Sequence, residues 1–441
     1  MGKSLRAYYQ NHPLKSILLI GFIVRIIAAI FSKGYAFQDD QFLVVEVAQK
    51  WIEGVECEWL PWLGGTHASG HSLFYPGMHF FFFKGLKWLG LVNPEWVILL
   101  VRVVHACYSL TIIYYGFRIV QWFHGDALAR KVGWILALFW MFPMLSVRNL
   151  VEFTCIPPLM VAIYWAIKYP EKNQWKQQLL MGIIAGLAIS FRFQTVLFVG
   201  GMGLVFLIQR EWLKTIVFGV GVALSVAVFQ GLVDYNIWGV PFAEFQEYVN
   251  YNWHHSGEYP NGPWYNYFLL ILGVFIPPLS FMFFAGNIRS FRKYLLLALP
   301  VFVFFAFHSY FPNKQERFVL PVFPFFIILG MMGWRDFLDQ PRKSTINWNV
   351  FYTGSVKFFW VLNTVLLFVL TPASTKISRV EVMNYLRENH PEGQMQDGFF
   401  ALETTHMWGT VLMPRFYQAE QGGVSSDVEQ CRRSQIGCPR S

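Results

Sequence analysis

Two neighbouring carboxylates, Asp39 and Asp40, follow the first long apolar run of the chain, in the segment YAFQDDQFLVVEVAQ at residues 35–49. A carboxylate close to a hydroxyl group can act as its general base. Two cations, Lys314 and Arg317, lie far along the chain in HSYFPNKQER at residues 308–317. Such side chains stabilise negative charge that develops on a phosphate. If the two segments meet, the chemistry that they suit is transfer of a sugar from a lipid phosphate to a hydroxyl.

The composition indicates a membrane protein. Of 441 residues, 55% are hydrophobic and only 14% are charged, whereas soluble domains carry about 25% charged residues. The apolar residues fall in runs close to bilayer length. The net charge of +9 comes from Lys and Arg in short loops between these runs, where they set topology. Because no recognition motif is present, we expect no nucleic-acid partner.

Eleven apolar runs predict membrane-spanning helices, so the expected fold is an all-α polytopic bundle. The runs are 15–32, 97–120, 131–146, 151–168, 178–192, 194–209, 213–233, 265–285, 293–308, 318–334 and 355–372. A further run, 73–90, contains Pro76, Gly77, Lys84 and Lys87, and we interpret it as a helix that lies at the membrane surface.

The basic residues decide between the two possible topologies. If 73–90 lies at the surface, the N-terminus and every short loop rich in Lys and Arg fall on the cytoplasmic side. If 73–90 spans the membrane, all later loops invert. We therefore predict a cytoplasmic N-terminus and one long outer loop at 33–96, in which an amphipathic helix at 40–54 begins at the acid pair.

This topology gathers polar segments on the outer face, so the active site is expected there. They include 146–152, Arg192, 233–265 and 308–317. The predicted organisation is a catalytic membrane domain at 1–372, with outer loops at 33–96 and 234–264, followed by a small outer-face segment at 373–441. Cys431 and Cys438 can form a disulfide if this tail faces an oxidising compartment, and the sequence leaves that open.

Four segments together resemble family 22 glycosyltransferases, the Alg9-like and GPI mannosyltransferases of the GT-C superfamily. The acid pair and EVAQ resemble the family's His-Pro-Asp-Glu and Glu-Val-Ala-His, although Phe37 and Gln38 stand where it has His-Pro and Asp40 where it has Glu. NKQERF resembles His-Lys-Glu-Glu-Arg-Phe, and SVRNLVE resembles Leu-Ser-Asn-Thr-Val-Glu. The loop 233–265 matches through Asp234, Gly239, Asn250, Pro263 and Trp264. The departures favour a distant, bacterial member.

The resemblance implies a GT-C bundle of about 11 transmembrane helices with interfacial helices in its first outer loop. It also implies a polyprenyl-phosphate sugar donor, typically carrying mannose, inversion at the anomeric carbon, a glycolipid or glycan acceptor, and neither metal nor nucleotide cofactor. The expected site residues are Asp39 and Asp40 for catalysis, Lys314, Arg317, His308 and Arg192 for the donor phosphate, and Asn149, Glu152, Asp234, His254 and Trp264 for acceptor or sugar.

Most of these residues have a structural alternative. An acid at the start of helix 40–54 also caps it, Lys314 and Arg317 suit the headgroup layer, and Trp264 suits the aromatic belt. His254 and His255 are adjacent and lack a third ligand at helical spacing, so we expect no metal there.

Three other functions compete with this prediction. A transporter or flippase would place charges at mid-membrane and often shows repeated halves, but the predicted spans are nearly free of charge and no repeat is evident. A ligase or polymerase that uses a lipid diphosphate usually has its large outer loop between late helices. A non-catalytic scaffold would not need acids and cations on one face. No retrieval signal is present at RRSQIGCPRS, which favours a bacterial inner membrane over the endoplasmic reticulum.

Overall fold

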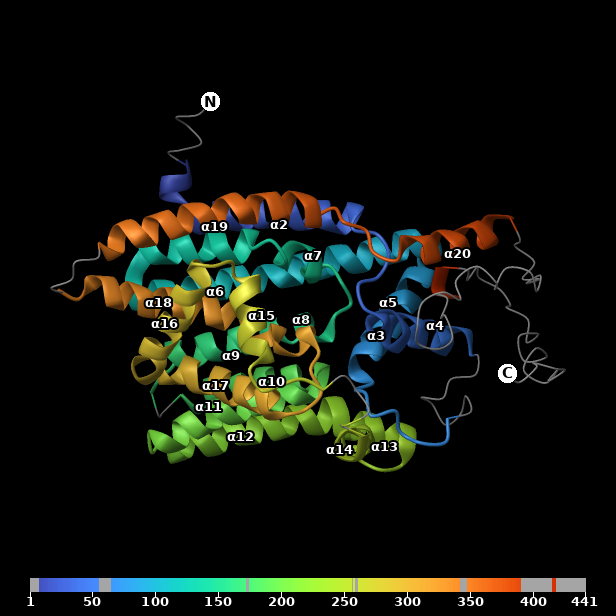
Figure 1. Cartoon of the computed structure of the whole chain (residues 1–441). Coiled ribbons are helices and arrows are strands. Elements are labelled where there is room, and N and C mark those ends of the chain that lie inside the picture. Colours follow the sequence, from blue (N-terminus) through green and yellow to red (C-terminus); the bar gives the residue numbers. More distant parts are fainter. Residues whose placement is uncertain are drawn as a thin grey trace.

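The computed structural model describes residues 8–54, 65–171, 174–255, 257, 261–341, 347–389 and 415–417, and its regular structure there is helical apart from two isolated β-bridges. The long helices lie roughly side by side in one elongated bundle (Figure 1). They are α2 (Pro13–Phe31), α6 (Pro94–Leu138), α9 (Ile156–Lys168), α10 (Trp175–Phe191), α11 (Val196–Ile208), α12 (Trp212–Val226), α16 (Leu279–Lys293), α17 (Leu295–Tyr310), α18 (Phe323–Asp339) and α19 (Trp348–Leu370). Cys431 and Cys438 lie outside the described residues.

Six described segments are long and apolar enough to cross a bilayer, which confirms an integral membrane protein. They are Pro13–Phe31, Pro94–Leu138, Val151–Lys168, Trp212–Trp238, Glu316–Asp339 and Trp348–Leu370. Each of the eleven predicted runs falls on one or more helices. The structure divides the run 265–285 between α15 (Asn266–Val274) and α16, because Pro277 and Pro278 stand between them.

Glycines allow the helices of the bundle to approach closely. A Cβ atom at Gly182 of α10 would lie 2.2 Å from the backbone oxygen of Phe218 on α12, and one at Gly286 of α16 would lie 2.0 Å from that of Gly330 on α18. Small residues at helix crossings are typical of membrane bundles, where close van der Waals packing drives association. Helix α18 is buried without interruption from Phe323 to Trp334 and forms the centre of the bundle.

The predicted span 15–32 carries a buried cation. Arg25 of α2 is fully buried and donates hydrogen bonds to the backbone oxygens of Leu136 and Ala137, at 3.2 and 2.9 Å, and to Ser109 Oγ. Those carbonyl groups belong to the last turn of α6, where the helix dipole favours a positive charge. Arg25 therefore has a structural role in joining α2 to α6.

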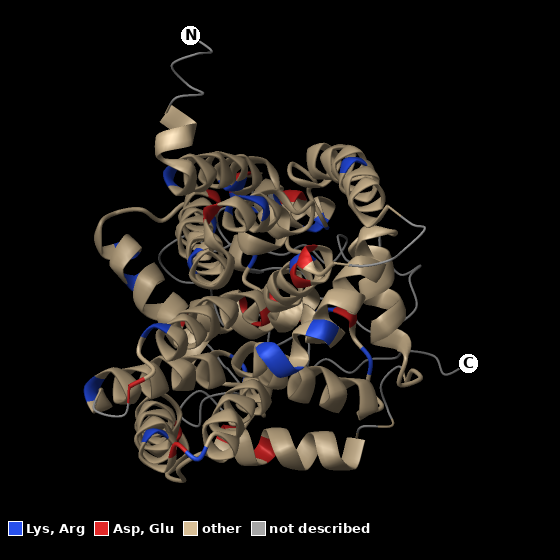
Figure 2. Cartoon of the chain, turned by 90° about the vertical axis from the view of Figure 1, so that its left-hand side faces the viewer, with Lys and Arg blue, Asp and Glu red and all other residues tan. Residues whose placement is uncertain are grey.

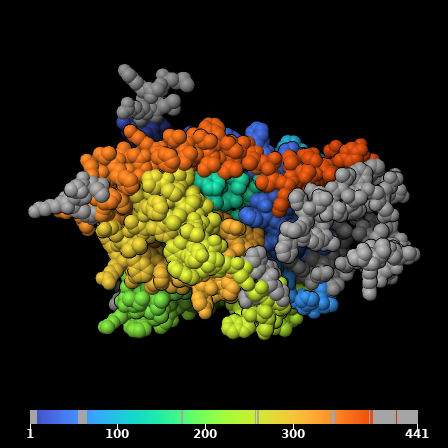
Figure 3. Space-filling view, viewed as in Figure 1, coloured from blue at the N-terminus to red at the C-terminus, as the bar shows by residue number. Residues whose placement is uncertain are grey.

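The predicted helices of the first outer loop are present at one end of the bundle (Figure 1). The chain forms one turn of α3 (Gln38–Asp40), a π-helical turn η1 (Gln41–Val45), α4 (Glu46–Glu53) and then α5 (Phe74–Trp88). An apolar cluster joins these elements to α20 (Ile377–Asn389) and to the turn η7 (Arg415–Tyr417) through Val45, Phe83, Met383 and Phe416. In Figure 3 the first loop (blue) is visible beside α20 (orange-red).

Charged residues gather at the opposite end, onto which Figure 2 looks. There Lys293 at the end of α16 pairs with Asp336 at the end of α18 at 2.6 Å, and His124 lies 3.8 Å from the same carboxylate. The loops that these residues flank are among those predicted to be cytoplasmic. Their meeting at one end agrees with a common side, while the orientation itself stays a prediction.

Candidate active site

The acid pair lies on the single turn of α3, directly after the segment that leaves α2. The two side chains have different surroundings: Asp39 is 51% exposed, whereas Asp40 is 4% exposed. One oxygen of Asp40, Oδ2, has no hydrogen-bond partner among the described residues. The pair therefore offers one accessible carboxylate and one enclosed carboxyl group.

Arg317 connects the acid pair to the late part of the chain. It lies on the 3₁₀ turn η5 (Glu316–Val322), and its Nη2 forms an ion pair with Asp39 Oδ2 across 278 sequence positions. Its Nε donates to Gln315 Oε1 at 3.0 Å and lies 3.3 Å from Glu152 Oε1. One guanidinium thus contacts two carboxylates from different parts of the chain.

Glu152 forms ion pairs with two arginines, Arg192 and Arg317. It lies on the short helix α8 (Val151–Thr154), and its side chain is 1% exposed. The Oε1 atom that faces Arg317 also pairs with Arg192 Nη1 at 2.6 Å. Arg192 has extended backbone angles between α10 and the 3₁₀ turn η3 (Phe193–Thr195), and its guanidinium lies 5.0 Å from the ring centre of Phe318. The Nε of Arg192 is buried and has no hydrogen-bond partner among the described residues.

The electrostatics of the site separate the two aspartates. Burial raises the pKa of Asp40 well above its usual value, and the nearby Glu152 carboxylate adds to the rise, while Arg317 offsets part of it. A carboxyl group in such surroundings favours its neutral form. Asp39 differs because it is half exposed and forms an ion pair with Arg317.

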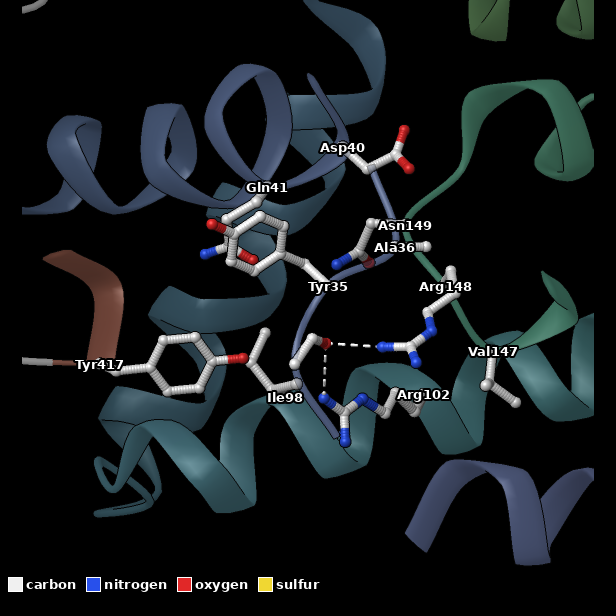
Figure 4. A pocket seen from close by; sticks show the side chains of 11 residues that line it. Tyr35, Ala36, Asp40, Gln41, Ile98, Arg102, Val147, Arg148, Asn149 and Tyr417 are labelled. Carbon is white, nitrogen blue, oxygen red and sulfur yellow. Dashed lines mark hydrogen bonds between the residues drawn. The ribbon is translucent and has the colours of Figure 1, made fainter. Parts of the chain in front are cut away.

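A small pocket lies beside Asp40 (Figure 4). Arg102 Nη2 and Arg148 Nη1 both donate to the backbone oxygen of Gly34, at 3.1 and 2.6 Å, and Arg148 also contacts Ser32 Oγ. Burial lowers the pKa of Arg148 to about 9, and the neighbouring guanidinium of Arg102 contributes to this shift. The other walls come from Tyr35, Gln41, Asn149 and Tyr417 among others.

Two predicted phosphate ligands, Lys314 and His308, form hydrogen bonds within the protein. Lys314 Nζ donates to the backbone oxygens of His308 and Ser309, each at 2.7 Å, and to that of Phe311. It therefore caps the C-terminus of α17. His308 Nε2 lies 3.1 Å from Gln194 Oε1, which also accepts a hydrogen bond from Arg192. Their roles towards phosphate stay predictions.

Three predicted acceptor residues have no contact with the acid pair. Asp234, on α13 (Leu232–Trp238), is fully buried, and it accepts hydrogen bonds from Gln230 Nε2 and from the backbone nitrogen of Glu244. His254 is exposed in the last turn of α14 (Ala243–His255), and Trp264 is 65% exposed. Asn149 differs, because it lies on the pocket wall beside Asp40.

Sequence reasoning did not single out Gln194, His79 or Tyr417. Gln194 joins Arg192 to Tyr248, whose hydroxyl accepts a hydrogen bond from Gln194 Nε2 at 2.6 Å. These residues carry no sequence pattern of their own, although Gln194 stands two positions from a predicted site arginine. In the part of the chain that the structure describes, no group of three or more His, Cys, Asp or Glu side chains is arranged to hold a metal ion.

Comparison with known proteins identifies the family. The model of the Alg9-like mannosyltransferase family matches residues 16–407. The chain belongs to this family. Mannosyltransferase APTG1 of Arabidopsis thaliana is 24% identical over 88% of this chain and 73% of its own length. GPI alpha-1,2-mannosyltransferase 3 of Danio rerio is 24% identical over 71% of this chain and 59% of its own length.

Solved structures support the fold of this mannosyltransferase family member. ArnT from Cupriavidus metallidurans, solved bound to undecaprenyl phosphate, aligns with a TM-score of 0.54 at 15% identity, over 89% of this chain and 67% of ArnT. The apo oligosaccharyltransferase of Archaeoglobus fulgidus aligns with a TM-score of 0.51 at 10% identity, over 88% and 59%. Both are GT-C enzymes, so the predicted GT-C bundle is confirmed, and family and fold together make the chain a membrane glycosyltransferase.

Proposed function

We propose that this family member transfers mannose from a polyprenyl-phosphate donor to a hydroxyl of a glycolipid or glycan, with inversion and with Asp39 as the general base. The observation that carries the proposal is the contact between Asp39 and Arg317, to which Glu152 adds Arg192. An accessible carboxylate thereby contacts one guanidinium group, which Glu152 links to a second. This is the combination that a hydroxyl nucleophile and a phosphate leaving group require.

The step proposed for this site is a single displacement. The acceptor oxygen attacks the anomeric carbon on the face opposite the phosphate and forms the new glycosidic bond. The bond from that carbon to the phosphate oxygen breaks, and its electron pair leaves with the polyprenyl phosphate. The hydroxyl proton moves to an oxygen of Asp39. Because attack and departure occur on opposite faces, the anomeric configuration inverts.

The arginines suit the leaving phosphate. Arg192 and Arg317 both pair with the same oxygen of Glu152. The negative charge of Glu152 therefore balances part of their positive charge before the donor binds. The buried Nε of Arg192 has no hydrogen-bond partner among the described residues, and it is available to an incoming phosphate oxygen. Asp40, which favours its neutral form, adds little repulsion towards that phosphate.

The relatives suggest which acceptor to test first. One of them, from Danio rerio, carries GPI in its name, so a glycosylphosphatidylinositol precursor is the first candidate. The outer-face active site, the cytoplasmic N-terminus and the bacterial inner membrane remain predictions of the sequence. The two relatives come from a plant and a fish, so extracts from both bacterial and endoplasmic reticulum membranes belong in the assay.

The test uses the purified full-length protein in nanodiscs, radiolabelled polyprenyl-phosphate mannose and a membrane glycolipid extract. We expect transfer by the wild type and a loss of about 10²–10⁴-fold in Asp39→Asn with donor binding retained. Glu53→Gln, the same chemical change on α4, is the matched control and should keep full activity. Equal transfer by wild type and Asp39→Asn would remove Asp39 as the base. Transfer only from a polyprenyl-diphosphate sugar would support the ligase alternative instead.

A further inference from the structure

His79 is a buried histidine that touches a residue of the pocket wall. It lies on α5 and is 5% exposed. Its Nδ1 lies 3.0 Å from the backbone oxygen of Tyr75, and its Nε2 lies 3.0 Å from the side-chain oxygen of Asn149. Both ring nitrogens thus face oxygen atoms that can only accept hydrogen bonds. A neutral imidazole carries one N–H and cannot donate to both.

One way to satisfy both contacts is a doubly protonated ring, but the surroundings oppose it. Burial lowers the pKa of His79, and the rings packed against it are those of Tyr75, Phe83 and His105. None of these three side chains carries a negative charge that would offset an imidazolium. An unpaired charge in such a position is costly.

The other way is to exchange the oxygen and nitrogen of the Asn149 amide, which have nearly the same shape. His79 Nδ1–H then donates to Tyr75, and Nε2 accepts from Asn149 Nδ2. The Asn149 side-chain oxygen then no longer faces His79 and can face the pocket, whose wall includes Asn149. That pocket is also lined by Arg102 and Arg148, and their positive charges favour an oxygen there over an N–H group.

We infer that His79 is a positioning residue, which accepts a hydrogen bond from Asn149 and so turns the Asn149 oxygen towards the pocket beside Asp40. In this orientation the Asn149 oxygen can accept a hydrogen bond from a hydroxyl group of the sugar or of the glycan that receives it. The inference rests on the proposed function, because it assigns an atom of Asn149 to a substrate of that reaction. No sequence pattern marked His79.

The test is a double-mutant cycle on transfer from polyprenyl-phosphate mannose. We expect His79→Leu and Asn149→Ala each to lower kcat/KM by about tenfold, the size of one hydrogen bond. The double variant should be no slower than Asn149→Ala, because His79 acts through Asn149. His79→Gln, whose side-chain oxygen can accept from Asn149, should restore most of the activity. Losses that multiply in the double variant, or full activity in His79→Leu, would overturn the inference.

Tyr75→Phe is the matched control for packing. It removes the hydroxyl that lies 2.8 Å from His105 Nε2 in the same cluster and leaves Asn149 untouched. It should lower the melting temperature about as much as His79→Leu while kcat/KM stays within twofold of the wild type. An equal loss of kcat/KM in both variants would mean that His79 acts by packing alone.

The ring of His79 gives a readout that does not depend on transfer. In protein labelled with ¹⁵N-histidine, and with His79→Gln identifying the signal, we expect an unprotonated Nε2 whose resonance moves in Asn149→Ala. A protonated Nε2 in the wild type would overturn the inference at any level of activity. If the wild type transfers nothing from any lipid-linked donor, the proposed function fails, and this spectrum still decides the orientation of Asn149.

Discussion

Replacing Arg317 by lysine tests whether the geometry of the guanidinium, and not only its charge, serves the site. Arg317 is 11% exposed and uses different nitrogens for Asp39 and Glu152. Lysine carries one compact ammonium group on a flexible stem, so it cannot hold two carboxylates in the same fixed arrangement. Arg317→Lys therefore loses at least one of the two charged contacts.

The expected loss of activity follows from the free energy of the lost contact. A hydrogen bond to a charged group contributes about 1.5–3 kcal/mol, and each 1.4 kcal/mol corresponds to about tenfold. If the loss falls on the transition state, Arg317→Lys lowers kcat/KM by about 10–150-fold. The assay is transfer from radiolabelled polyprenyl-phosphate mannose. The melting temperature is measured alongside, because breaking a buried ion pair also costs about 3–5 kcal/mol of stability.

Arg335→Lys is the matched control, since it makes the same change at the far end of the same segment, Glu316–Asp339. Arg335 is 51% exposed and pairs with Asp339 one turn away on α18. Such surface pairs contribute about 0–1 kcal/mol, so its activity and melting temperature should match the wild type. Activity of Arg317→Lys within twofold of the wild type would refute the argument, because charge alone would then suffice.

Two further predictions concern groups around the site. Lys314→Met should lower stability by about 2–4 kcal/mol, because it leaves three carbonyl groups of the α17 C-terminus without their donor; a raised KM for the donor at unchanged stability would contradict this capping role. Glu46 accepts hydrogen bonds from the backbone nitrogen of Phe416, and burial raises its pKa from 4.5 to about 7. Since this pKa lies above that of a free glutamate, protonation of Glu46 favours the folded state; the stabilisation is fully present below about pH 4.5 and is lost as the pH rises through 7. The melting temperature should accordingly be lower at pH 8.5 than at pH 5.5, and Glu46→Gln should reduce this difference; equal pH dependence in both proteins would disprove it.

Much of the fold could be predicted because its signals are local. Runs of apolar residues near bilayer length mark the helices, and the amphipathic pattern at 40–54 predicts what became α3, η1 and α4. The resemblance of four segments predicted the family, which the family comparison confirms. The prediction missed the division of 265–285, although Pro277 and Pro278 are a local signal for it. It also missed that Arg25 is buried, because that depends on the end of α6 that receives its guanidinium.

The sequence by itself determined that this is a helical membrane protein with acids early and cations late in the chain. Only the tertiary structure decided which of those cations meets the acids. Lys314 and Arg317 are three positions apart and alike in charge, yet Lys314 turns back to the carbonyl groups of α17 while Arg317 reaches Asp39 and Glu152. The direction of each side chain depends on the path of the backbone through η5 and on the groups that helix α8 and the turn α3 bring near it. Such contacts between distant segments follow from packing, which residue types and spacing alone do not specify.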